Sequence, residues 1–89
     1  MLNLKSSARD SKRYILVRGM RSSVEKAILE YIGVLGWAEA SPVFVSESHS
    51  ETVVAVNRGA LTNVRAALAL AKNELTILRV SGTLKGLKK

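Results

Sequence analysis

The sequence predicts an α+β fold in which a four-stranded antiparallel sheet carries two helices on one face. Three observations support this prediction: short segments rich in β-branched residues, longer segments with helically spaced apolar residues, and their order, β-α-β-β-α-β. Right-handed crossover connections place both helices of such a chain on the same side of the sheet. This arrangement is the split βαβ, or ferredoxin-like, sandwich.

Four segments have the composition of strands, and these are residues 13–19, 38–47, 52–57 and 75–81. Pro42 lies in the second segment and lacks a backbone N–H, so this strand is expected at an edge of the sheet. The short polar turn from Ser48 to Ser50 predicts an antiparallel hairpin between the second and third strands. In this topology the first and third strands lie at the centre of the sheet.

The first helix is expected to begin at Ser22, because Glu25 follows three residues later and the pair forms a capping box. Gly36 is the expected C-terminal stop. Between them one apolar stripe recurs at helical spacing. Its members are Val24, Ile28, Tyr31, Ile32 and Leu35.

The second helix is expected over residues 60–73, with a core stripe of Leu61, Val64, Leu68 and Ala71. Outside this stripe lie further apolar residues, namely Ala66, Ala67 and Leu70. A helix that is apolar nearly all round is usually buried on two sides, so a partner protein is expected to cover the second side. The alternative is that alanine is present as the best helix former.

The length of 89 residues suits one domain, and the net charge of +7 is unevenly distributed. Residues 22–51 carry five glutamates and one lysine, whereas the remaining residues carry thirteen basic and two acidic side chains. The excess of basic residues in both terminal parts of the chain predicts a polyanionic partner such as nucleic acid. The alternative is that the positive charge only keeps the protein soluble. The expected organisation is a flexible basic tail over residues 1–12, a domain over 13–84 and a basic tail over 85–89; the alternative for the basic, Ser-containing N-terminus is a transit peptide.

Several classes of site are excluded or disfavoured by composition. The chain has no cysteine and one histidine, His49, so it offers no disulfide, no thiolate ligand and little for a metal site or a catalytic relay. We expect no catalytic residue, metal site or cofactor in the protein. No apolar run approaches the length of a membrane span, and the N-terminus lacks the apolar core of a secretory signal. A cytoplasmic protein with no membrane contact is expected.

If the chain binds RNA, it is expected to contact the RNA backbone rather than the bases. The two central strands offer Tyr14 as their only aromatic residue, whereas base-reading sheets of this topology stack bases on several. The candidate RNA contacts are Arg58, Arg65, Lys72, Arg79, Ser81, Lys85, Lys88 and Lys89. The alternatives are a plain turn at Arg58-Gly59 and a solvated lysine tail after Ser81.

Strand alternation predicts an apolar sheet face with scattered arginines, which suits a protein interface. On this face the first strand contributes Tyr14, Leu16 and Arg18, and the fourth contributes Ile77, Arg79 and Ser81. The candidate partner contacts are Tyr14, Leu16, Ile77, Ala66 and Leu70. The alternative is a reversed face, in which the strand residues belong to the core.

Acylphosphatases share this topology, size and basicity, and Arg18, Gly19, Arg21 and Asn57 superficially fit their catalytic residues. Their phosphate-cradling loop, however, reads roughly G-x-V-Q-G-V-x-[FY]-R, and this chain has VRGMRSSVE instead. The sequence therefore disfavours this enzyme class.

Three segments resemble the protein component 2 family of archaeal ribonuclease P, which is related to small subunits of eukaryotic ribonuclease P and MRP. They are Asn57-Arg58, NVRAALAL at residues 63–70 and RVSGTLK at residues 79–85, and the RYIL opening of the first strand is also similar. The chain departs from the family in its short connection over residues 73–76, in its early end, and in lacking a cysteine before Arg58.

The resemblance implies a ferredoxin-like, non-catalytic subunit that binds ribonuclease P RNA and precursor tRNA. It also implies a partner, ribonuclease P protein component 3, and assembly of the pair as a heterotetramer. In such a holoenzyme the RNA and Mg²⁺ remove the 5′ leader from precursor tRNA, and the proteins support the folding and activity of the RNA. A protein-interaction module in another complex is the alternative function.

Overall fold

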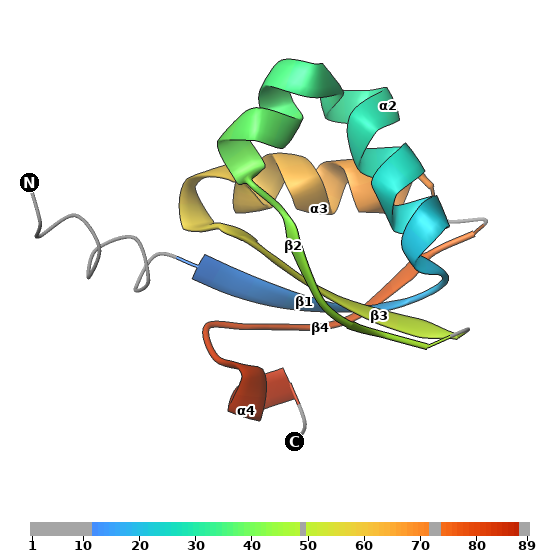
Figure 1. Cartoon of the computed structure of the whole chain (residues 1–89), viewed down its shortest axis with the longest axis vertical. Helices are drawn as coiled ribbons and strands as arrows, with labels where there is room; N and C mark the ends of the chain where they lie inside the picture. Colours follow the sequence, from blue (N-terminus) through green and yellow to red (C-terminus); the bar gives the residue numbers. More distant parts are fainter. Residues whose placement is uncertain (1–11, 49, 72–73, 88–89) are drawn as a thin grey trace, which may run out of the picture.

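The computed structural model describes residues 12–48, 50–71 and 74–87, which form a four-stranded antiparallel sheet with strand order β2-β3-β1-β4 (Figure 1). Its elements are β1 (Lys12–Arg18), α2 (Arg21–Ala40), β2 (Val43–Glu47), β3 (Glu51–Asn57), the 3₁₀ helix η1 (Arg58–Ala60), α3 (Leu61–Leu70), β4 (Thr76–Ser81) and α4 (Leu84–Leu87). The order confirms the predicted ferredoxin-like topology, with the first and third strands central. β2 lies at an edge, as Pro42 predicts.

The hydrophobic core lies between the sheet and the helices α2 and α3, which cover the same face (Figure 1). Alternate strand residues point toward these helices and are fully buried: Ile15, Val17, Val54 and Val56. Each such side chain stabilises the fold by about 1.5–3 kcal/mol through removal of apolar surface from water. Tyr14 and Leu16 therefore lie on the opposite, outer face of the sheet, where the sequence predicted them.

The first turn of α2 differs from the predicted capping box. The helix begins at Arg21 with Met20 as its N-cap, and no side chain among the described residues caps it. Glu25 pairs instead with Arg21, one helical turn earlier, with Nε and Oε2 3.4 Å apart. The prediction of a cap at Ser22 is therefore wrong, and an exposed i,i+4 ion pair stands in its place.

α2 continues past the predicted stop at Gly36 and ends at Ala40, so the predicted strand start at residue 38 is wrong. A kink at Gly33, with φ 74° and ψ −178°, divides the helix. The predicted stripe holds for Val24, Ile28 and Ile32, but Tyr31, before the kink, is 47% exposed and Leu35, after it, is 82% exposed. The helix ends where Ser41 adopts a left-handed conformation and donates its N–H to the Trp37 carbonyl at 2.8 Å.

The predicted core stripe of α3 is confirmed, since Val64 and Leu68 are buried and Leu61 and Ala71 pack against the core. Ala67, which the sequence placed on the outer side, is fully buried. The reason is that α2 and α3 pack against each other over the sheet.

A bulge in β4 changes the face of Ile77. The ladder with β1 pairs Leu16 with Arg79 and then Val17 with Ile77, so Leu78 is the extra residue. Ile77 consequently shares the core face with Val17 and packs against the core. The predicted placement of Ile77 beside Arg79 on the outer face is wrong, because simple alternation fails at a bulge.

α4 lies on the outer face of the sheet, opposite α2 and α3 (Figure 1), and contacts β1 and β4. Thr83 caps it, because its hydroxyl oxygen accepts the Gly86 N–H at 3.1 Å. Leu87 is only 6% exposed. Residues 85–87, assigned from the sequence to a tail, therefore belong to the fold. None of the helices within the described ranges is long and apolar enough to span a membrane.

Candidate nucleic-acid interface

One end of the sheet gathers positive charge from two elements, β1 and η1, that are distant in sequence. The β1–β3 register sets Lys12 opposite Asn57, so Arg58 follows directly beside the start of β1. Arg13 reaches the turn after β4, where a Cβ atom on Gly82 would lie 3.7 Å from its Nη1 atom. Beyond this turn comes the exposed Lys85. We call Lys12, Arg13 and Arg58 the basic end; Lys85 belongs to α4, on the outer face of the sheet.

Backbone carbonyls hold part of the basic end in place. Arg13 donates through Nη1 to the Lys12 carbonyl at 2.8 Å, and Lys12 donates through Nζ to the Ser41 carbonyl at 3.4 Å. The end of β3 is tied to α2 because Asn57 donates through Nδ2 to the Glu39 carbonyl at 2.7 Å. Because these partners are neutral carbonyls, they do not compensate the positive charge of Lys12 and Arg13. An anionic ligand can therefore be attracted to this end.

The opposite end of the sheet has compensated charge. Arg21 pairs there with Glu25 and, at 3.9 Å, with Glu47 across to β2. Its guanidinium also lies 4.5 Å from the centroid of the Phe44 ring. Within the described residues these are the ion pairs that the structure contains. The two ends of the sheet therefore differ in the charge that they present to a polyanion.

The predicted RNA contacts are distributed over several surfaces. Arg58 belongs to the basic end, whereas Lys85 is exposed on α4 and Arg65 is exposed in the middle of α3. Arg79 donates through Nη1 to the Gly86 carbonyl at 3.5 Å and so helps to hold α4. Ser81 accepts the Thr83 N–H at 3.1 Å and shapes the turn. Lys72, Lys88 and Lys89 lie outside the described residues.

The sequence reasoning missed Lys12 and Arg13. It assigned Lys12 to the N-terminal tail and treated Arg13 only as a strand residue. The structure places both in β1, at the end where β3 and β4 finish. Lys12 and Arg13 stand at the start of an apolar, strand-like segment, and this position could have indicated that they belong to β1. The register that brings Arg58 beside them, however, pairs segments that are far apart in the sequence.

The predicted partner contacts divide between two faces of the molecule. Tyr14 and Leu16 lie on the outer face of the sheet, partly exposed. Ala66 and Leu70 lie on α3, and Leu70 is 62% exposed. These two groups are on opposite sides of the sheet, so one compact partner surface cannot contact both.

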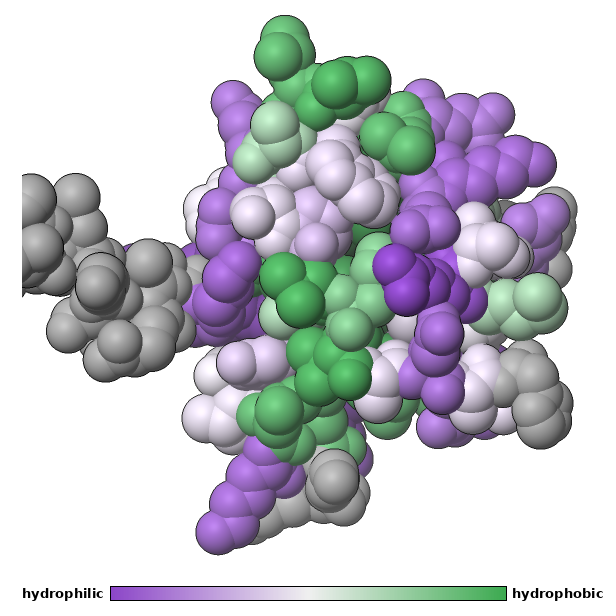
Figure 2. Space-filling model, in the orientation of Figure 1, coloured by the Kyte–Doolittle hydropathy of each residue, from purple (hydrophilic) through white to green (hydrophobic). Residues whose placement is uncertain are grey.

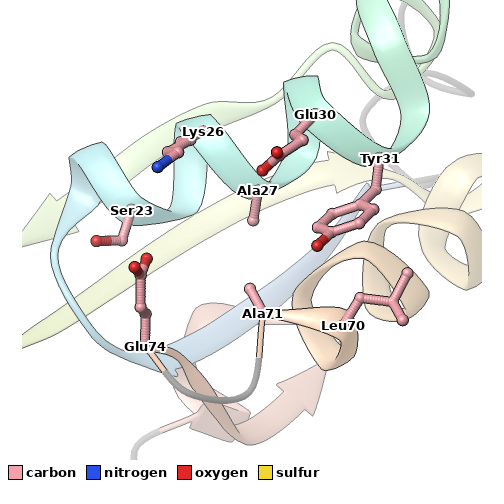
Figure 3. Close-up of a pocket in the computed structure, with 8 residues that line it drawn as sticks. All are labelled: Ser23, Lys26, Ala27, Glu30, Tyr31, Leu70, Ala71 and Glu74. Atoms are coloured by element: carbon pink, nitrogen blue, oxygen red, sulfur yellow. The ribbon is translucent and has the colours of Figure 1, made fainter.

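A polar cleft of about 180 Å³ lies between α2 and α3 (Figure 3). The side chains of Glu30 and Glu74 and the Tyr31 hydroxyl point into it, and Lys26 stands at its side. The two carboxylates disfavour a phosphate ligand at this position. No group of three or more His, Asp or Glu residues suited to a metal ion occurs in residues 12–48, 50–71 and 74–87.

The residues that superficially fit an acylphosphatase do not come together. Asn57 lies opposite Lys12, at one end of the β1–β3 ladder, and Arg18 lies opposite Glu51, at the other end. Lys12 and Arg18 are six positions apart along β1, which is roughly 20 Å. They cannot act on one phosphate.

Comparison with known proteins agrees with the resemblance seen in the sequence. Residues 6–89 match the model of the Rpp14/Pop5 family. A relative from Methanococcus maripaludis, ribonuclease P protein component 2, is 28% identical over an alignment of 78 residues, and the match covers 76% of this chain and 60% of that relative. Because the family model covers nearly the whole chain, the chain belongs to the Rpp14/Pop5 family.

Proposed function

We propose that this chain is a non-catalytic protein subunit of ribonuclease P that binds RNA through its basic end. The basic end is the observation that carries the proposal, because β1 and η1 meet there and the described partners of Lys12 and Arg13 are neutral carbonyls. The name of the Methanococcus relative supports the assignment to ribonuclease P. Phosphate contacts of this kind position a protein on RNA without reading its sequence.

The outer face of the sheet supports backbone recognition rather than base stacking. RNA-recognition sheets stack bases on aromatic residues of the two central strands. Here β3 has no aromatic residue, and α4 contacts β1 on this face. Shape and charge are therefore the properties by which the chain would bind RNA.

The wider function follows as part of the same proposal. The RNA component, with Mg²⁺, would remove the 5′ leader from precursor tRNA, and this chain would support the active RNA fold. A second protein, ribonuclease P protein component 3, would bind beside it, and the pair would assemble as a heterotetramer in the cytoplasm. The chain itself would contribute no catalytic residue or cofactor.

The test measures binding of the chain to ribonuclease P RNA over a series of salt concentrations. Arg58→Glu should weaken binding and reduce the log–log salt slope by about 0.7–0.9, the value for one lost phosphate contact. Lys26→Glu is the matched control, because it makes the same charge change on an exposed residue of α2 beside two carboxylates. Equal slopes for the two variants would contradict RNA binding at the basic end.

The second candidate function is a protein-interaction module in another complex. The observation that favours it is the exposure of Val34 and Leu35 on α2, 76% and 82% respectively, since large exposed apolar side chains mark interaction surfaces. Absence of binding to ribonuclease P RNA at moderate salt, both alone and with the candidate partner, would favour this function.

A further inference from the structure

Two residues at the basic end of the sheet are hydrogen-bonded to the C-terminal end of α2. Asn57 donates through Nδ2 to the Glu39 carbonyl at 2.7 Å, and Lys12 donates through Nζ to the Ser41 carbonyl at 3.4 Å. Lys12 and Asn57 are ladder partners in β1 and β3, so the two bonds start from neighbouring positions of the sheet. Figure 2 shows hydrophilic residues along the side of the molecule where β1 begins, left in the view. The end of α2 therefore lies against the basic end.

The end of α2 is a firm anchor for these bonds. Its last residue, Ala40, is fully buried, and Trp37 packs against the core with its ring centroid 6.5 Å from that of Phe44 on β2. The carbonyls in the last turn of a helix have no partner within that helix. The carbonyl of Glu39 is therefore open to a donor from outside α2, and Asn57 supplies it.

Asn57 occupies the N-cap position of the 3₁₀ helix η1. An asparagine side chain at such a position commonly accepts an N–H from the helix that follows it. Here the side chain does not cap η1, and its amide donates to α2 instead. Asn57 thus fixes the start of η1 to a neighbouring element rather than to η1 itself.

Arg58 is the residue whose backbone this bond holds in place. It follows Asn57 directly, and its own carbonyl accepts the Leu61 N–H, so the backbone is fixed on both sides of it. The Arg58 side chain is exposed and forms no ion pair within the described residues. The direction in which its guanidinium leaves the protein therefore depends on how the backbone is held.

The two bonds to α2 differ in what they allow. The Lys12 bond is long, at 3.4 Å, and its ammonium group ends a flexible stem, so it can turn toward a phosphate. The Asn57 bond is short, at 2.7 Å, and comes from a short side chain that is partly buried. Lys12 is therefore suited to contact RNA, whereas Asn57 is suited to hold its neighbour in position.

We propose that Asn57 is a positioning residue for RNA binding: its hydrogen bond to the end of α2 orders η1, so that Arg58 meets a phosphate with little loss of conformational freedom. Preorganisation of this kind raises affinity because less entropy is lost on binding. The effect of Asn57 on RNA binding then passes through Arg58. The proposal deepens the proposed function and rests on it, since it takes Arg58 as an RNA contact.

The test is a double-mutant cycle on the full chain with ribonuclease P RNA, using Asn57→Ala, Arg58→Ala and the double variant. Asn57→Ala should weaken binding about threefold in the parent chain and less than about 1.5-fold in the Arg58→Ala background. Its log–log salt slope should equal that of the parent chain, because no charge is removed, whereas Arg58→Ala should lower the slope by about 0.7–0.9. The heteronuclear NOE of the Arg58 amide should fall in Asn57→Ala, which reports the local loss of order directly.

Asn63→Ala is the matched control, because it makes the same change on an exposed residue of α3 and should leave both binding and the NOE of Arg58 unchanged. No loss of binding from Asn57→Ala, or an equal loss in both backgrounds, would overturn the proposal. An unchanged NOE at Arg58 would also overturn it. If Arg58→Ala itself left the salt slope unchanged, the RNA contact would fail together with its positioning, so failure of the proposed function is a separate result.

Discussion

At the residue scale, Gly19 connects β1 to α2 in a conformation and a space that only glycine fits. Its φ of 147° lies in a region that residues with a side chain rarely adopt. Its N–H donates to the Ser50 carbonyl at 2.8 Å, and its carbonyl accepts the buried Thr52 hydroxyl at 2.9 Å. A Cβ atom here would overlap the side chain of Leu75. The connection between β1 and α2 therefore requires glycine.

Gly19→Ala should lower the free energy of unfolding by about 2–3 kcal/mol, because backbone strain and overlap with Leu75 act together. The measurement is urea denaturation, in which the midpoint should fall and the slope should stay constant. Gly59→Ala is the control, since a Cβ atom there meets nothing within 4 Å, and its effect should stay within about 0.5 kcal/mol. Equal losses for both variants would contradict the special role of Gly19.

The candidate site was only partly predictable at this scale. Arg58 could be named from composition and motif, and it lies at the basic end. Lys12 and Arg13 could not be grouped with them, because the pairing of Lys12 with Asn57 joins residues 45 positions apart. The sequence gives the type of each side chain directly, whereas the residues that lie beside it in the fold depend on the register between strands.

At the element scale, α4 differs most from its prediction as a tail. It is one turn long, far too short to be stable alone. Three contacts hold it: the Thr83 cap, the Arg79 hydrogen bond to Gly86 and the burial of Leu87. A tertiary contact therefore decides whether this segment is helical.

Leu87→Ala should release α4 from the sheet and lower the free energy of unfolding by about 2 kcal/mol, at the low end for a buried leucine because the short helix can move away. Amide hydrogen exchange should speed up at Gly86 and Leu87 more than in α3. The control is Leu84→Ala, in which the side chain is already 40% exposed and the loss should be smaller. Unchanged exchange in α4 would show that Leu87 does not anchor it.

At the scale of the whole molecule, the fold separates charge along the sheet. The basic residues of β1 and η1 meet at one end, while Arg21 is compensated by Glu25 and Glu47 at the other. The sequence shows an acidic middle between basic ends, but antiparallel pairing converts this pattern into two ends of one surface. A polyanion is expected to approach the basic end first.

The position of Arg65 tests how far the RNA footprint extends. If RNA contacts only the basic end, Arg65→Glu should change the salt slope much less than Arg58→Glu, because Arg65 lies in the middle of α3. The measurement is the same salt series with ribonuclease P RNA. Equal changes in slope would extend the footprint along α3.

The sequence by itself determined the order of elements, the central and edge strands, the core stripe of α3 and the excess of basic residues. These features depend on local periodicity, composition and chain order, which no distant contact has to supply. The tertiary structure decided the kink at Gly33, the bulge that turns Ile77 to the core, the docking of α4 and the convergence of Lys12, Arg13 and Arg58. Each of these depends on packing or register between segments far apart in the chain, where long-range contacts outweigh local preference.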